Sequence, residues 1–210
     1  MKMNFLLGAI LILCFSGCIV VPKKTEDKFI VAPVFVDKKC SSTSAKIIYK
    51  QVLKSDFTSE RYVDPNENHG GIRVPSKYIL DTIQKYGFLE TNSKNGNFDI
   101  FIEFTVHEDD YSNFLQQSNF WLTNLTLGII PSWGSGNIRI TSMFRDKDGT
   151  VVGEYASQKV EYNFFKGIIF FPFNFDSKNT PAYMHSEYIP KMTIDIFNQA
   201  AAKNILCGPR

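Results

Sequence analysis

The segment over residues 98–107 limits the possible folds more than any other part of the sequence. Large apolar side chains occupy every second position, among them Ile100, Ile102 and Phe104, and mostly polar side chains stand between them. A side-chain period of two residues predicts a β-strand with one face on the core and the other mostly toward water, as in an antiparallel sheet. Residues 138–145 repeat the pattern.

A turn and a further strand follow the second alternating segment. Residues 146–149 read Asp-Lys-Asp-Gly, which predicts a hairpin turn into a strand over 150–164. The apolar phase of that strand shifts between Tyr155 and Val160, which predicts a β-bulge at this point.

Helices are predicted on both sides of these strands in the sequence. A buried strand over 29–36 is followed, after Cys40, by an apolar stripe at helical spacing over 45–53. A polar, turn-rich loop over 54–74 follows, with a short strand on either side of its centre. The residue types predict a second helix from 75 to the stop at Gly87, and a short strand from Phe88.

A last helix is expected over 189–205, with Pro190 limiting or kinking its start. The order of elements predicts an α+β fold in which helices pack on one face of an antiparallel (mixed) sheet.

The first residues indicate export. A positive start and an apolar run lead to the small residues Ser16 and Gly17, which precede Cys18. This is the pattern of an export signal that is later removed. Residues 16–18 resemble the lipobox of bacterial lipoproteins, which implies that Cys18 is acylated and becomes the new N-terminus. Ile19 stands where that family places Asp for inner-membrane retention, so the resemblance implies a lipid-anchored protein of the outer membrane that faces the periplasm.

Domain boundaries follow from this assignment. We expect a signal peptide over 1–17, a lipidated tether over 18–27 and a single periplasmic domain over 28–210. An uncleaved anchor helix over 5–21 is the alternative, since this segment is nearly free of polar side chains. The segment 78–106 and the later hairpin resemble the small α+β module of the curli-secretion lipoprotein and of the N-terminal domain of the Tol-Pal system's propeller protein. That resemblance concerns the fold.

Charge and cysteine content restrict the partners. The 23 basic and 21 acidic residues nearly balance and form no long basic block, which argues against nucleic-acid binding. Cys40 and Cys207 remain in the exported part and predict a disulfide in an oxidising compartment. Two separately buried thiols are the alternative.

Two aromatic stretches, over 120–136 and 164–173, stand apart from the strand pattern. They are either core that seals one end of the sheet or an exposed patch that contacts a membrane surface, a lipid or a partner protein. The residues that we expect to make such a contact are Trp121, Trp133, Phe170 and Phe171. Ser132, Ser135 and the glycines around Trp133 have the composition of a loop.

Catalytic signatures are weak. The densest polar cluster covers His107, Glu108, Asp109 and Asp110, but consecutive strand residues point to opposite faces. The spacing of histidines and cysteines fits no zinc site, and the turn over 146–149 lacks the remaining ligands of a calcium loop. No cofactor or metal is expected.

The sequence therefore favours a cell-envelope lipoprotein with a non-enzymatic binding or assembly role at the outer membrane and an unidentified envelope protein as partner. A carrier of lipids or small molecules, an immunity lipoprotein and a hydrolase that uses the acidic cluster remain alternatives.

Overall fold

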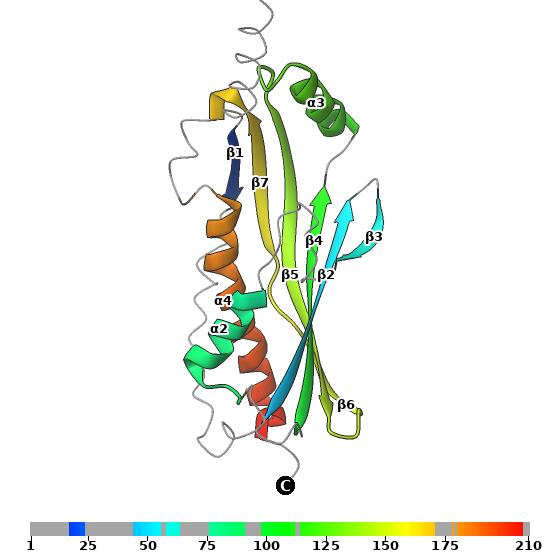
Figure 1. The fold of residues 1–210 in the computed structure, drawn as a ribbon, viewed down its shortest axis with the longest axis vertical. Coiled ribbons are helices and arrows are strands. Elements are labelled where there is room, and N and C mark those ends of the chain that lie inside the picture. The colour runs from blue at the N-terminus through cyan, green and yellow to red at the C-terminus, as the bar shows by residue number, and fades with distance from the viewer. Residues whose placement is uncertain are drawn as a thin grey trace, which may run out of the picture.

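A computed structural model describes residues 17–23, 44–55, 58–63, 76–90, 98–111, 114–170, 178 and 180–207. These residues form one mixed sheet of seven strands with helices packed against it (Figure 1). The predicted α+β fold with helices on one face is confirmed.

The sheet has the order β1-β7-β5-β4-β2-β3, and β6 pairs with the part of β5 that β7 leaves free. All pairings are antiparallel except the parallel pair of β2 and β4. The strands are β1 (Gly17–Pro22), β2 (Ala45–Ser55), β3 (Thr58–Val63), β4 (Ile100–Tyr111), β5 (Ser132–Asp146), β6 (Val151–Ala156) and β7 (Val160–Gly167).

Two helices, α2 (Ser76–Tyr86) and α4 (Pro181–Ala202), cover one face of the sheet, and the short η4 (Ile205–Cys207) follows α4. The third helix, α3 (Phe114–Leu125), connects β4 to β5 and lies at the opposite end of the molecule from the β5–β6 hairpin (Figure 1). The side chains between sheet and helices alternate along β4 as the sequence predicts, with Ile102 and Phe104 fully buried.

Phe197 of α4 is the centre of this core. Its ring stacks on Phe88 with centroids 4.6 Å apart and lies 6.1 Å from both Phe104 and Phe144. One side chain thus joins the last helix to the two central strands and to the segment after α2.

The predicted helix over 45–53 is wrong, because these residues form β2. Ala45, Ile48 and Val52 match a helical stripe, but Ala45, Ile47 and Tyr49 match an alternating one equally well and are the positions that pack on the core. Pairing with both β3 and β4 decides between the two periods. The pairing with β4 joins segments far apart in the sequence, so local spacing could not reveal it.

The first residues of β5 include two glycines, so the sequence did not predict a strand there. The strand begins at Ser132, within a stretch that has a loop-like composition. A Cβ atom on Gly134 would overlap the ring of Phe164, and one on Gly136 would lie 2.6 Å from Cζ of Tyr162. These glycines therefore leave room for the aromatic rings of β7, which is a known use of glycine in strands.

Three other boundaries differ from the predictions. The expected bulge between Tyr155 and Val160 is a complete break that separates β6 from β7. Helix α4 begins at Pro181, where Thr180 caps it, so that Pro190 lies inside the helix and not at its start. The strand predicted from Phe88 is absent in the described residues 88–90, which make only an isolated bridge between Glu90 and Ser44.

The first strand was not predicted. Gly17–Pro22 pairs with β7, within the segment 18–27 that we expected as a lipidated tether and in which no pattern predicts a strand. Ile19 and Val20 are buried. The predicted strand over 29–36, the residue Cys40 and the centre of the loop over 64–74 lie outside the described residues.

Candidate functional site

An ordinary surface helix turns its apolar side chains toward the protein and its polar side chains toward water. Helix α3 has the reverse arrangement. Thr123 is buried, and Asn119 and Gln116 are half-buried, at positions that lie on one face of a helix. Thr123 donates its hydroxyl hydrogen to the carbonyl oxygen of Asn119, 2.8 Å away. Polar side chains thus face the protein body.

Apolar side chains cover the outer side of the same helix. Leu125 is 79% exposed and Trp121 is 68% exposed, and Leu115, Phe120 and Leu122 are exposed as well. Single exposed leucines are normal on protein surfaces, but contiguous large apolar patches mark sites of interaction with proteins or membranes.

Neighbouring segments carry further exposed apolar side chains at this end of the molecule. Trp133, at the start of β5, is 52% exposed, and the loop after α3 and the segment after β7 add further exposed side chains. We call these exposed side chains together the apolar end, and define it as Leu115, Phe120, Trp121, Leu122, Leu125, Leu127, Ile129, Ile130, Trp133 and Ile169.

Hydrogen bonds hold the apolar end in shape. Asn119 donates its side-chain amide to the carbonyl oxygen of Pro131 at 2.8 Å, which ties α3 to the loop that follows it. Lys166 of β7 donates to the side-chain oxygen of Asn124 at 2.9 Å and places its ammonium 4.9 Å from the centre of the Phe120 ring. Since these contacts join α3 to the sheet, the surface is preformed.

The loop after α3 contains backbone strain at an exposed leucine. Leu127 has a φ of 53°, a region that costs a side chain with a Cβ atom roughly 1–2 kcal/mol. Gly128, with a φ of 86°, follows and donates its backbone N–H to the carbonyl oxygen of Thr123 at 2.7 Å, ending the helix. The fold keeps an apolar side chain at a position where asparagine or glycine is less strained.

The backbone of Cys18 lies at the same end of the sheet as Trp133. Cys18 of β1 pairs with Lys166 of β7, and Lys166 pairs in turn with Ser132 of β5. Two neighbouring-strand spacings separate Cys18 from Ser132, which amounts to about 10 Å. The strands of the sheet thus bring the predicted acylation site close to the apolar end.

Charge is absent from the segment that forms most of this surface. The sequence contains no acidic, basic or histidine residue between Asp110 and Arg139. Of the described charged residues, Lys166 contacts the apolar end, and its ammonium is already engaged by Asn124 and Phe120. Within the part of the chain that the structure describes, this surface therefore carries little charge.

The four predicted contact residues differ in their placement. Trp121 and Trp133 are exposed on the apolar end and so do not belong to the core. Phe170 is half-buried, with its ring centre 5.5 Å from that of Phe165, and Phe171 lies outside the described residues. Cys207 ends η4, and because Cys40 is outside the described residues, the disulfide stays a prediction.

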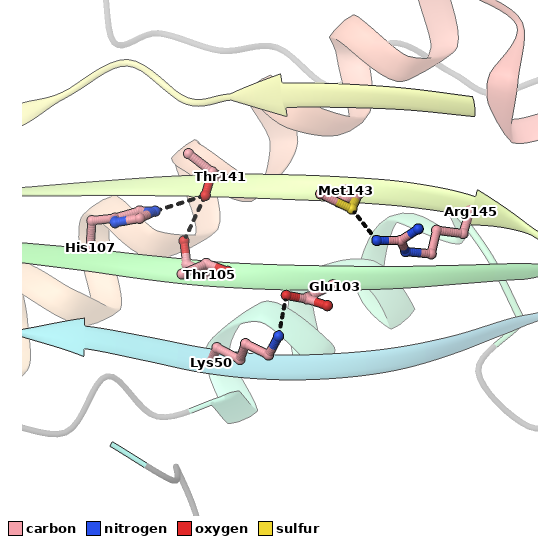
Figure 2. Close-up of polar contacts among 7 residues, drawn as sticks. All are labelled: Lys50, Glu103, Thr105, His107, Thr141, Met143 and Arg145. Carbon is pink, nitrogen blue, oxygen red and sulfur yellow. Dashed lines mark hydrogen bonds and ion pairs between the residues drawn. The ribbon is translucent and has the colours of Figure 1, made fainter. Parts of the chain in front are cut away.

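The face of the sheet opposite α2 and α4 is polar in the strands that the structure describes. Lys50 of β2 forms an ion pair with Glu103 of β4, and a ring nitrogen of His107 lies 2.8 Å from the hydroxyl oxygen of Thr141 on β5 (Figure 2). Beside them lies an open groove of about 450 Å³, whose lining includes Arg139 and Glu154. No aromatic residue of the apolar end contributes to it.

The acidic cluster at the end of β4 does not converge. His107 and Asp109 lie on the half-buried outer face of the strand, and Glu108 points to the opposite face, where it accepts a hydrogen bond from the hydroxyl of Tyr162 at 3.1 Å. Within the described ranges, no group of three histidine, cysteine or acidic residues is placed to hold a metal ion.

The predicted hairpin turn at 146–149 is confirmed. The carboxylate of Asp146 accepts backbone hydrogen bonds from Asp148 at 3.0 Å and Thr150 at 2.9 Å. This turn leads from β5 into β6.

Comparisons with known proteins identify no family. No protein-family model matches the chain, and no curated protein matches it either. The PelC dodecamer from Paraburkholderia phytofirmans is a structural neighbour at 10% identity and a TM-score of 0.35, covering 86% of this chain and 98% of the other.

A DUF4136 family protein from Bacteroides thetaiotaomicron is similar at 11% identity and a TM-score of 0.26, covering 92% of this chain and 97% of the other. Values this low carry no function from either protein to this chain. Among the helices that the structure describes, none has the length and apolar character needed to cross a membrane.

Proposed function

We propose that this chain is a lipid-anchored, non-enzymatic protein of the bacterial cell envelope whose folded domain rests on a membrane through its apolar end. The observation that carries the proposal is the reversed polarity of α3, which directs Trp121 and Leu125 outward and Thr123 inward. A helix of this kind is stable against the protein only through its polar side, and its apolar side remains to be covered by another apolar medium.

The place of Cys18 favours a membrane over other occupants. If Cys18 is acylated, its acyl chains enter a bilayer about 10 Å from the start of β5. An anchor so close to the apolar end brings that surface to the same membrane. Tryptophan at such a boundary is typical of membrane interfaces, because its ring is apolar and its N–H is polar.

The outward direction of these side chains favours a membrane surface over a single carried lipid. A carrier encloses its ligand in a mostly apolar pocket. The groove described on the sheet is instead open and partly polar, and it lies apart from the apolar end. The exposed side chains form an outer surface, which suits a lipid bilayer.

Flotation with vesicles tests the membrane contact without the acyl chain. The mature chain from residue 18, with Cys18→Ser, is mixed with phospholipid vesicles and centrifuged through a density gradient. We expect it to float with the vesicles, and we expect a variant with Trp121→Ser and Leu125→Gln to remain at the bottom.

A matched control addresses general loss of apolar surface. Val151 and Val152 are exposed apolar residues on β6, at the end of the molecule opposite α3 (Figure 1). A variant with Val151→Thr and Val152→Thr should float as the parent does. Equal flotation of all three proteins, or flotation of none, contradicts the proposed contact, and incorporation of labelled palmitate into the wild type but not into Cys18→Ser tests the anchor separately.

A further inference from the structure

The apolar end has the chemistry to recognise the neutral apolar part of a membrane and not its charge. The inference below rests on the proposed function, since it concerns the class of lipid that the same surface binds. Proteins that select anionic membranes use clusters of lysine and arginine beside their apolar residues. The segment between Asp110 and Arg139 contains no charged residue.

Lys166, a charged residue that contacts α3, makes these contacts within the protein. Its ammonium donates to Asn124 and lies over the ring of Phe120, so both partners belong to α3. Through these contacts Lys166 helps to position α3. The ammonium would lose both contacts if it bound the phosphate group of a lipid instead. Even when free, one lysine near an anionic surface contributes only about five-fold to binding.

The rigidity of the surface points in the same direction. The hydrogen bond from Asn119 to Pro131 and the closure of the loop at Gly128 fix α3 and its loop before any membrane is met. An amphipathic peptide that folds into a helix only on an anionic membrane depends on electrostatic attraction to bind. An apolar surface that is already folded does not need this attraction.

We infer that the apolar end binds electrically neutral, zwitterionic phospholipid surfaces by apolar burial, with little dependence on lipid charge or salt. Burial of apolar surface is not screened by ions, and excluded salts strengthen it slightly. Electrostatic binding falls steeply as the Debye length shrinks.

A lipid and salt series tests this inference. The mature Cys18→Ser chain, acetylated at its N-terminus so that its α-amino group carries no charge, is titrated with vesicles of phosphatidylcholine alone and with vesicles that also contain phosphatidylglycerol. Binding is followed by the emission of Trp121 and Trp133, the two tryptophans of the chain. We expect partition coefficients of the two vesicle types to agree within about five-fold, the limit set by one lysine. We also expect little loss when salt rises from about 0.05 to about 0.5 M.

The possible outcomes separate this inference from the proposed function. Binding that appears only with phosphatidylglycerol, or that falls more than ten-fold with salt, overturns the inference and leaves a membrane-binding protein. Absence of an emission change with either vesicle type, in a chain that circular dichroism shows to be folded, overturns both.

Discussion

Replacing Trp121 by alanine isolates the contribution of one side chain to membrane binding. The residue is 68% exposed, and a fully buried tryptophan hides about 250 Å² of surface. About 170 Å² is therefore free to leave water, and its complete burial contributes about 4 kcal/mol at about 25 cal/mol per Å². At a membrane interface roughly half of this area leaves water, which gives about 2 kcal/mol, or about thirty-fold in the partition coefficient.

The variant also keeps the fold intact. Alanine is the best helix former, and Trp121 faces outward, so the free energy of unfolding should not fall. The assay is a titration with phosphatidylcholine vesicles, followed by the emission of Trp133, which remains in the variant.

Two matched variants make the comparison sharper. Trp121→Phe keeps most of the apolar area and should lose only a few-fold in binding. Val152→Ala removes an apolar side chain that is 41% exposed at the far end of the molecule and should leave vesicle binding unchanged, because that end does not face the membrane. A loss of less than about two-fold in Trp121→Ala, with an unchanged unfolding midpoint, would refute the proposed role of this face.

Three further predictions concern strain, titration and the core. Leu127→Asn relieves the positive φ and should raise stability to urea by up to about 1 kcal/mol while weakening vesicle binding, and a loss of stability contradicts this. Burial lowers the pKa of His185 to about 4, so between pH of about 6.5 and 4 the unfolded chain binds a proton that the folded chain does not. The free energy of unfolding should therefore fall by up to about 3 kcal/mol as the pH is lowered from about 6.5 to about 4. His185→Leu should remove this dependence on pH, and an equal pH dependence in the variant and the parent would contradict the assignment to His185. Phe197→Ala should cost about 3–5 kcal/mol of unfolding free energy, because the ring fills the centre of the core, and a cost below about 1 kcal/mol would contradict that placement.

Strict alternation made β4 predictable, and pairing across the sequence made β2 unpredictable. In β4 the apolar side chains repeat every two residues, which does not fit a helix. This period therefore predicts both the strand and the face that is buried. In β2 the apolar positions fit both periods, and the parallel neighbour that selects the strand comes from a distant part of the sequence. At β1, Ile19 and Val20 are too few to form a pattern, and only β7 reveals where they pack.

Of the apolar end, the sequence predicted Trp121 and Trp133 as contact residues but left open whether they are exposed or belong to the core. An apolar stretch such as 120–131 reads the same whether it fills a core or covers a surface. One signal was available: Gln116, Asn119 and Thr123 share a helical face, so a helix here has a continuous polar side and an apolar one. Which side faces inward depends on the placement of α3 at the end of the sheet, where Pro131 and Lys166 supply polar partners.

The most direct test of the central claim uses the acylated, full-length mature protein in vesicles whose lipids carry bromine on their acyl chains. Both tryptophans of the chain belong to the apolar end, so the entire tryptophan emission reports on this surface. If the apolar end rests in the membrane beside the anchor, the emission shifts to shorter wavelength and is strongly quenched. Emission that stays unshifted and unquenched, while the protein remains bound through its acyl chains, would show that the apolar end faces something other than lipid.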